Sequence, residues 1–472
     1  MTEIMKEKIK KSLADSAKLR WSVLLLVSFS MAVNYYFYDA LSPLKEVLTT
    51  ELGFTSSDYG FFISAYSIPN VFFAMAVIGG IILDRIGIRI TGTMFIGSMV
   101  VGSFLTWYGA TETFNSGGLG YAFLGSFMTD YSPALKMMSI GFFMFGLGAE
   151  TTCVVISKVV VKWFKGRELA LALGLNIAVA RLGMGAALIV SPRLIQPTWT
   201  TPIFFGFVLL ACGLIAFIFY TFIDRAYDKR EKDMGEQAED EAFRFADLGK
   251  LLTNPSFIYV ALLCVTFYSA VFPFVKYAPD MMVNKFGIDK ETSGFITAIL
   301  PFGTIVFTPL FGWVCDYKGK SASLMILGSI LLIVVHLLFS LTAITPYVPM
   351  FILGVAFSLV PAAMWPSVAK IVDESRIGTA YGLMFSIQNI GLWAFPMLIG
   401  KVLDASNPGV AEAKAAGQAV VYDYTYPVLM LAGLGLVGLM FAFLLKHADK
   451  TSGFGLEQPK KQKKEEPAEL PA

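Results

Sequence analysis

The sequence alternates between apolar runs of about twenty residues and shorter polar segments, and this alternation restricts the fold more than any other feature. A helix of roughly that length crosses the hydrocarbon core of a bilayer. Because backbone polar groups must be satisfied within lipid, a chain of this kind folds as membrane-spanning helices. Twelve runs are predicted as spans, at residues 21–38, 59–83, 90–110, 137–157, 169–191, 202–223, 256–275, 292–315, 322–343, 348–369, 377–400 and 425–445.

Composition excludes several other classes of protein. The chain is 56% hydrophobic and only 15% charged, whereas soluble domains carry about 25% charged residues. Its four cysteines and two histidines show no metal-ligand spacing, and no nucleophile lies beside a base. We therefore predict an all-α membrane protein that is not an enzyme and has no cofactor and no metal. Its expected partners are a small-molecule substrate and the lipid bilayer, with no nucleic acid, and it is expected to be monomeric.

Lys and Arg residues predict the orientation. Basic residues gather in cytoplasmic loops, and twelve spans with the N-terminus inside leave only eight of the 37 on the outer side. Both termini are therefore expected in the cytoplasm of a multi-pass protein, in the plasma membrane or, for a bacterium, the inner membrane. The first run lacks a small-residue cleavage site and is predicted to be retained. The outer eight are Lys45, Lys136, Arg193, Lys276, Lys285, Lys290, Lys401 and Lys414.

A polar segment between the sixth and seventh spans divides the chain in two. Residues 1–20 are predicted as a cytoplasmic N-terminus, 21–223 as one six-helix half, and 224–255 as a partly helical cytoplasmic linker. Residues 256–446 form the second half. The highly charged tail at 447–472 is predicted to be disordered.

The two halves resemble each other. Two sets of positions recur, one at an offset of 232 and one at an offset of 208. Such duplication is typical of transporter folds whose binding site lies between the halves near mid-membrane. The first set pairs Gly80, Asp84 and Gly87 with Gly312, Asp316 and Gly319, and the second pairs Gly174 and Gly183 with Gly382 and Gly391.

The turn after the second span, GGIILDRIGIR, resembles the loop signature of the major facilitator superfamily. Its acid could face the positive end of a neighbouring helix, its arginines could bind carboxylates of the other half, and its glycines allow a tight turn. An ordinary charged loop is the alternative. The gating candidates are Gly80, Asp84, Arg85, Gly87, Arg89, Asp316 and Gly319.

Several further stretches together resemble the lysosomal dipeptide transporter branch of that superfamily. They are SAYSIPNV at 64–71, FGLGAE at 145–150, WFKGRELALALGLNIAVARLG at 163–183, FYSAVFPF at 267–274, and MWPSVAK and IGTAYGLMFSIQNIGL at 364–370 and 377–392. The resemblance implies a major facilitator fold with twelve transmembrane helices and dipeptide transport by uniport. It departs at 111–134 and 404–424, and the glycosylated partner and lysosomal sorting of animal members are not expected here.

Two charged residues lie within the spans as drawn, Glu150 and Arg181. Each costs about 2.5–3.5 kcal/mol at the centre of a helix, so each is expected to face a cavity or a partner. Measured from Lys158 and Glu168, they lie ~12 Å and ~20 Å above the inner surface. This difference matches the separation of amine and carboxylate in a dipeptide, so Glu150 is predicted to bind the ammonium and Arg181 the carboxylate. The resemblance implies the same. A salt bridge that locks the two helices, or one that substrate opens, are the alternatives.

Other residues are weaker candidates for the substrate site. Aromatic residues in spans often only pack or anchor at the interface, and amides often bridge helices. Tyr35, Tyr36 and Tyr38 cannot all face one way, and the four repeated span glycines favour close packing. A carrier of an organic anion or monocarboxylate, possibly proton-coupled, would need Arg181 alone and is the alternative function. The additional candidates are Tyr36, Tyr66, Asn70, Tyr268, Trp365, Gln388 and Asn389, the last at the repeat position of Arg181.

Overall fold

The computed structural model describes residues 16–232, 246–373 and 376–459, and within these ranges the regular structure is entirely helical. In the first half the elements are α1 (Ala17–Ala40), η2 (Ser42–Leu44), α2 (Lys45–Leu52), α3 (Ser56–Ser64), η3 (Ala65–Ser67), α4 (Ile68–Phe73), α5 (Met75–Ala110), α6 (Glu112–Asn115), α7 (Tyr121–Gly125), α8 (Pro133–Phe164), α9 (Leu169–Arg193) and α10 (Thr201–Lys232). After the linker helix α11 (Ala246–Leu252), the second half comprises α12 (Pro255–Phe286), α13 (Lys290–Lys318), α14 (Ser321–Leu341), α15 (Tyr347–Ile371), α16 (Ile377–Ser406), α17 (Val410–Ala415) and α18 (Thr425–Ser452).

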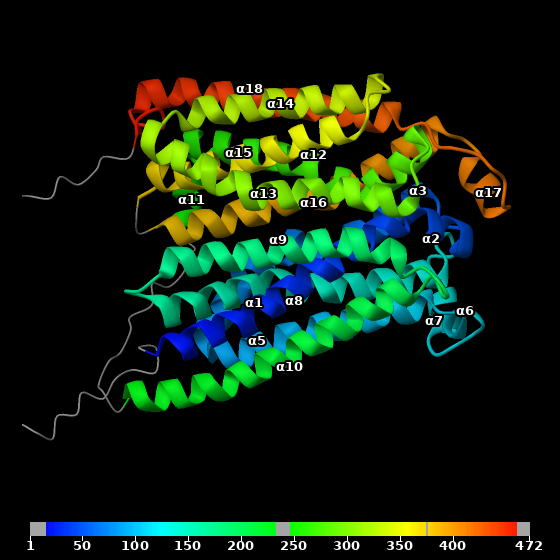
Figure 1. The fold of residues 1–472 in the computed structure, drawn as a ribbon, viewed down its shortest axis with the longest axis horizontal. Coiled ribbons are helices and arrows are strands. Elements are labelled where there is room, and N and C mark those ends of the chain that lie inside the picture. The colour runs from blue at the N-terminus through cyan, green and yellow to red at the C-terminus, as the bar shows by residue number, and fades with distance from the viewer. Residues whose placement is uncertain (1–15, 233–245, 374–375, 460–472) are drawn as a thin grey trace, which may run out of the picture.

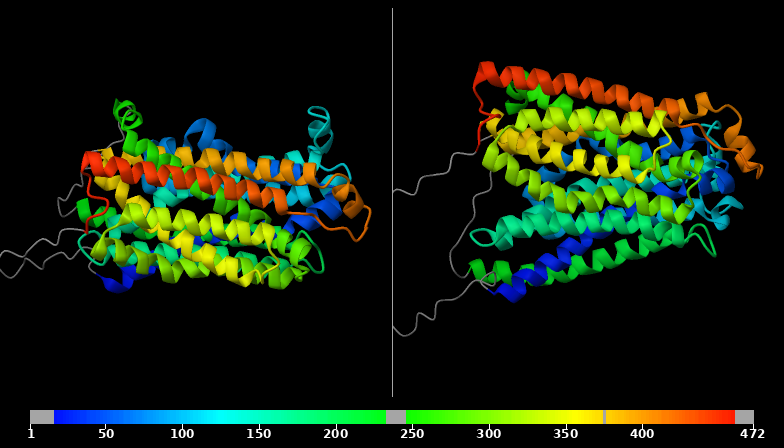
Figure 2. Two further views of the ribbon diagram at one scale, coloured as in Figure 1. Left: turned by 90° about the horizontal axis from the view of Figure 1, so that it is seen from above. Right: turned by 45° about the horizontal axis from the view of Figure 1, so that its top comes forward.

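The long helices run along a common direction and form two bundles (Figures 1 and 2). In Figure 1 the helices of the first half lie below those of the second. The start of α1 and the end of α18 lie at the same end of the molecule, together with α11. We call this the inner end. The short helices α2, α6, α7 and α17 lie at the opposite, outer end (Figure 1).

Within the described ranges, eleven helical segments are long and apolar enough to cross a membrane. The apparent missing span lies in α5, which has 36 residues and would extend about 54 Å if straight, well beyond a bilayer core. Gly87 interrupts it with φ 79° and ψ 168°. The part of α5 before Gly87 completes the second predicted span with α3, η3 and α4, and the part after it is the third. The twelve predicted crossings are thereby accounted for.

The two halves repeat the same packing. The first helix of each half contacts the fifth and sixth, as α1 with α9 and α10, and α12 with α16 and α18. A methyl group on Gly183 would overlap the carbonyl of Ala32, and one on Gly391 would overlap the side chain of Ser269. These two glycines therefore mark equivalent close contacts, as predicted. Gly174, however, has open space around it, and Gly382 makes only an ordinary contact with Val77.

The halves also pack directly on each other along two lines. Helix α3 lies along α16, and α9 lies along α13. The second span is irregular where it crosses this interface, because α3 gives way to the 3-10 turn η3 and α4 ends at Phe73, just before Ala74. Ala74 has φ 47° and ψ 44°, a left-handed conformation that non-glycine residues rarely adopt. The interruption places side chains of the second span beside α8 and α16.

Two predicted boundaries differ from the structure. Helix α10 continues to Lys232, so the linker begins as helix, and residues 233–245 lie outside the described part. The tail was expected to be disordered from residue 447, but α18 continues to Ser452, and Gly453–Gln458 then packs back on the inner end. Leu456 in this segment is fully buried. Residues 460–472, also predicted to be disordered, lie outside the described part.

The returning segment accepts hydrogen bonds from backbone N–H groups at the start of α14. The N–H groups of Lys320 and Ser321 donate to the carbonyls of Glu457 and Leu456 at 3.2 and 2.9 Å, and the N–H of Ser323 donates to the Glu457 carboxylate at 2.8 Å. The first N–H groups of a helix have no partner within the helix. We call Gly453–Gln458 the C-terminal strap, and it supplies those partners.

Candidate functional site

Glu150 lies in the middle of α8 and is held by partners other than a cation. The Tyr66 hydroxyl, in η3, donates to Glu150 Oε1 at 3.0 Å, and the Asn389 side chain of α16 lies near the carboxylate. Glu150 is half-buried. The carboxylate therefore stands where the second span, the fourth span and the opposite half meet.

Arg181 lies in the middle of α9, and within the described residues no carboxylate oxygen lies within 4 Å of its nitrogens. Its guanidinium carbon is 5.7 Å from the centroid of the Tyr35 ring and 5.3 Å from that of the Phe357 ring. Its Nη1 donates to the Met184 sulfur at 3.9 Å, a weak interaction. Glu150 and Arg181 are thus not ion-paired in this structure, and the predicted alternative of a locking salt bridge is not the arrangement found.

The predicted difference in depth between the two charges is wrong. It took Lys158 as the inner end of the fourth span, whereas α8 continues to Phe164. Glu150 therefore lies about 21 Å from the inner end of its helix, and Arg181 about 18 Å from the start of α9 at Leu169. The two charges share nearly the same level, so any separation between them lies across the bundle.

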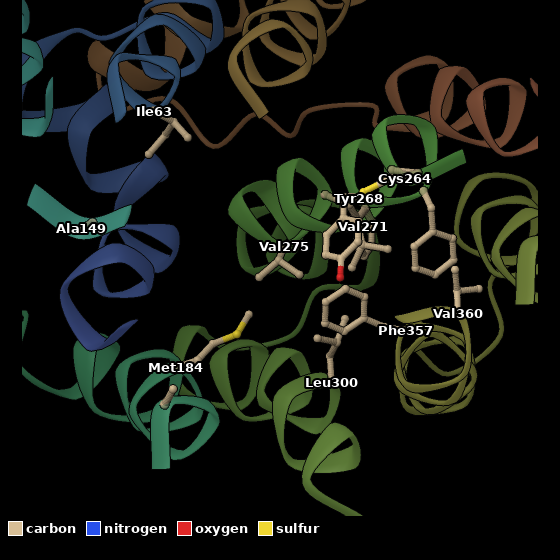
Figure 3. Packing of buried hydrophobic residues seen from close by; sticks show 14 of the residues in the cluster. Ile63, Ala149, Met184, Cys264, Tyr268, Val271, Val275, Leu300, Phe357 and Val360 are labelled. Atoms are coloured by element: carbon tan, nitrogen blue, oxygen red, sulfur yellow. The ribbon is translucent and has the colours of Figure 1, made fainter. Parts of the chain in front are cut away.

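The remaining substrate candidates fall into separate places. Trp365 Nε1 donates to the Tyr268 hydroxyl at 3.0 Å, and the Tyr268 ring meets Phe357 edge to face at 5.8 Å. Of these rings, Phe357 contacts Arg181, and Tyr268 and Trp365 continue the row of contacts away from it. Figure 3 shows Tyr268 and Phe357 on the second half, with Met184 of α9 and Ala149 of α8 on the first.

Three other candidates have different surroundings. The Cys264 thiol contacts Gln388 Oε1 at 3.6 Å, in the helix–helix contact of α12 and α16. Asn70 is fully buried, and neither of its amide atoms has a partner among the described residues. The structure does not bring Tyr36 to the two charges, because its ring packs with Ala40 and Ala187. It is Tyr35 that contacts Arg181, and Tyr38 that packs against Tyr66 at 4.6 Å.

Two buried ion pairs, missed by the sequence reasoning, join the halves at the outer end. Lys45 Nζ lies 2.9 Å from Asp280 Oδ2, and Lys276 Nζ lies 2.7 Å from Asp39 Oδ1. All four side chains are at most 2% exposed. Both lysines were counted as outer loop charges, because the drawn spans ended at residues 38 and 275. The available signal was a base and an acid four residues apart, Lys276 and Asp280, in the continuation of α12. We call these four residues the outer lock.

Further polar contacts reinforce the outer end. The Asp404 carboxylate in α16 accepts hydrogen bonds from the N–H groups of Ser56 and Ser57, at 3.0 and 2.7 Å, at the start of α3. The Tyr424 hydroxyl donates to Asp280. The Asp404 contacts join the two halves at the outer end, whereas the Tyr424 contact holds Asp280 within the second half.

The gating candidates lie at the inner end, and their observed partners belong to the same half. Asp84 pairs with Lys158 at 2.9 Å. Arg89 pairs with Asp224 and Asp228 of α10 at 3.2 and 2.7 Å, so the expectation that it binds carboxylates of the other half is not met here.

The repeated glycines in the two inner turns behave alike. Gly87 and Gly319 both have positive φ, 79° and 72°, as a tight turn requires. Gly80 and Gly312 make no close contact, and Arg85 and Asp316 are exposed. The duplicated signature therefore forms two equivalent turns.

The fold and the site define a polytopic helical membrane protein with two duplicated halves, a polar centre between them and an ionic closure at one end. The chain belongs to the Major Facilitator Superfamily, whose model matches residues 24–396 and again residues 277–469. Its homologues and structural neighbours are transporters, not enzymes.

Curated relatives narrow the comparison. The chain is 30% identical to the lysosomal dipeptide transporter MFSD1 of Mus musculus over 411 residues, covering 84% of this chain and 82% of that protein. The human protein of the same name is 29% identical with the same coverage. A hexuronate transporter of Bacillus subtilis is 23% identical over 86% of this chain and 93% of its own.

Solved structures share the fold at low identity. The nucleoside transporter NupG has a TM-score of 0.66 at 14% identity, covering 90% of this chain and 99% of its own. A bacterial homologue of the human lysosomal transporter Spinster, in an inward-facing and unoccupied conformation, has a TM-score of 0.64 at 13% identity, with coverage of 92% and 98%.

Proposed function

We propose that this protein carries dipeptides, or similar small zwitterions, across the membrane by alternating access. The observation that carries the proposal is that Glu150 and Arg181 stand at one level near mid-membrane without being paired to each other. An ammonium group could bind Glu150 beside Tyr66, and a carboxylate could bind the free N–H donors of Arg181. The name of the 30% identical mouse protein supports the same class of substrate.

The closed outer end supports an inward-facing state as the one described. For substrate to enter from the other side, the outer lock and the Asp404 contacts must open and the inner ends must approach. Gly80, Asp84, Arg85, Gly87, Arg89, Asp316 and Gly319 are proposed to act in that approach, since they lie at the inner turns of both halves. The ion pairs that Asp84 and Arg89 form within the first half are then those of the inward-facing state, and different partners are expected in the outward-facing state.

We further propose that transport is facilitative. Glu150 is the only acid in the spans predicted from the sequence, but Asp39 and Asp280 are also buried in helices. Both are paired with lysines, so their charge is compensated. His336, also buried, contacts the carbonyls of Leu332 and Ala270 and is placed for packing rather than for proton relay.

Uptake by purified protein in liposomes tests these proposals together. A panel of dipeptides should compete for uptake, amino acids and organic anions should compete weakly, and uptake should run without a proton gradient. Preference for a hexuronate or another monocarboxylate would instead favour the organic-anion carrier, for which Arg181 alone suffices. Strict dependence on an imposed gradient that survives Glu150→Gln would refute uniport.

Replacing Asp84 by Asn should slow turnover and leave substrate affinity largely intact. Asp84 and Lys158 are 37% and 28% exposed, and exposed pairs contribute at most about 1 kcal/mol. The folded protein should therefore melt near the wild-type temperature. Km and maximal rate of uptake, measured with the melting temperature, separate the two effects. A collapse of affinity at unchanged maximal rate would assign Asp84 to substrate binding instead.

The inner end is proposed to face the cytoplasm, because the basic residues gather on that side. A cysteine introduced by Thr451→Cys, at the end of α18, should resist an impermeant maleimide in intact cells and react after permeabilisation. Rapid labelling in intact cells would reverse the orientation. A cysteine at Ser116→Cys, beside the outer helix α6, serves as the control that should label at once.

A further inference from the structure

Phe357 reaches Arg181 from the opposite half of the molecule. It lies in α15 and is 2% exposed. Its ring packs against Phe267, Tyr268 and Phe272, with centroid distances of 6.3, 5.8 and 5.3 Å. Figure 3 shows the Phe357 ring beside Tyr268. Because this cluster holds the ring in place, the Arg181 guanidinium contacts a packed ring rather than a mobile side chain.

Two rings, one from each half, therefore contact the same cation. Tyr35 of α1 and Phe357 of α15 lie 5.7 and 5.3 Å from the guanidinium carbon of Arg181, within the range of cation–π attraction. An aromatic ring attracts the guanidinium through its face. Unlike a carboxylate, it does not take up the N–H groups in hydrogen bonds to oxygen. The planar set of donors that binds a carboxylate in two places is thus left for substrate.

We propose that Phe357 is a positioning residue that sets the preference for substrates with a free carboxylate, by holding the Arg181 guanidinium toward the substrate site. This inference rests on the proposed function, in which Arg181 binds that carboxylate. Because Phe357 and Arg181 belong to different halves, their contact depends on how the halves are packed at this level. Recognition of the carboxylate is thereby linked to the conformation in which the outer end is closed.

The experiment compares the affinities for a dipeptide and for its C-terminal amide, measured on purified full-length protein. Wild type should prefer the free carboxylate. Phe357→Leu keeps an apolar side chain but removes the ring face, and should lower that preference about three- to tenfold, as expected for one cation–π contact. Phe357→Tyr keeps the ring face and should retain the wild-type preference.

A matched control separates positioning from loss of packing. Phe274, also 2% exposed and in the same half, packs against His336 and Phe339 rather than against Arg181. Phe274→Leu should lower the melting temperature about as much as Phe357→Leu but leave the ratio of the two affinities unchanged. In an Arg181→Ala background, Phe357→Leu should no longer change the ratio.

The possible outcomes are distinguishable. If wild type prefers the free carboxylate and Arg181→Ala removes that preference, but Phe357→Leu retains it, the role of Phe357 is refuted and the proposed function stands. If Phe274→Leu alters the ratio equally, the effect is one of packing and the inference is again refuted. If wild type does not distinguish the dipeptide from its amide, or Arg181→Ala leaves the ratio unchanged, both the inference and the role of Arg181 fail.

Discussion

Replacing Asp280 by Asn is expected to open the outer end of the protein. The substitution leaves the Lys45 ammonium buried without its carboxylate, and breaking a buried ion pair costs about 3–5 kcal/mol. Opening returns Lys45 to water, so the cost falls on the closed state and shifts the equilibrium away from it. Lys45 Nζ also lies 4.2 Å from the centroid of the Tyr422 ring. This cation–π contact offsets part of the cost but cannot replace the lost carboxylate charge.

The shift can be measured through a cysteine that the closed outer end protects. Val275, next to Lys276, is fully buried. In a background with the four native cysteines replaced by Ala, Val275→Cys should react slowly with an impermeant maleimide from the outer side. A shift of about 1.4 kcal/mol in the equilibrium between closed and open states changes the open population tenfold. Adding Asp280→Asn should therefore accelerate that reaction at least tenfold.

The chain offers a matched control for the outer lock. Arg193 and Glu291 also join the halves at the outer end, at 3.2 Å, but are 57% and 60% exposed. An exposed pair contributes little, so Glu291→Gln should leave labelling nearly unchanged. The combination Lys45→Met with Asp280→Leu removes both charges and should restore slow labelling. Equal labelling in Asp280→Asn and Glu291→Gln would show that the buried pair does not hold the outer end closed.

Glu150→Gln and Arg181→Ala, tested separately, should each weaken dipeptide binding by about 1.5–3 kcal/mol. This is the range for hydrogen bonds to charged groups. Glu150→Gln should affect substrates with a free amine most and N-acetylated analogues least. Arg181→Ala should affect substrates with a free carboxylate most and their amides least. Binding of the dipeptide, its N-acetylated analogue and its C-terminal amide to each variant provides the measurement.

The folded structure also predicts how stability should respond. Because Glu150 bonds to Tyr66 and Arg181 contacts rings, removing one charge does not strand the other in a broken pair. Melting temperatures of the two single variants should therefore not be rescued by combining them. A locking salt bridge would give unstable single variants and a recovered double. Glu291→Gln and Arg193→Ala, which alter exposed charges outside the site, are the controls. A double variant that binds dipeptides normally would eliminate the site.

The sequence predicted the parts of the fold that depend on local pattern. Apolar runs of the right length predicted the spans, and the recurrence of Gly183 as Gly391 predicted equivalent helix contacts that the structure contains. It failed at the inner end of α8. Charged residues there were read as the end of the span, but Lys158 and Lys162 are long enough to pair with Asp84 and Asp224 while the helix continues.

The candidate site was predictable only in part. Glu150 and Arg181 stood out because charge is rare in an apolar run, yet whether they pair depends on helix rotation, which local sequence does not specify. Helical periodicity separates Tyr36 from Tyr35 and Tyr38 but does not say which face of α1 lies beside Glu150 and Arg181. The outer lock depends on contacts between residues more than 230 positions apart, and no local pattern encodes such a pairing.

The C-terminal strap has a practical consequence for anyone attaching a reporter to this protein. The apolar pattern suggests that the chain could be cut and fused just after residue 446. A fusion there would remove the carbonyls and the Glu457 carboxylate that cap α14, together with buried Leu456. Lys370 at the end of α15 would also lose the carbonyls of Gly455 and Gln458. Fluorescent or affinity domains should therefore be joined after Pro459, where the strap remains intact.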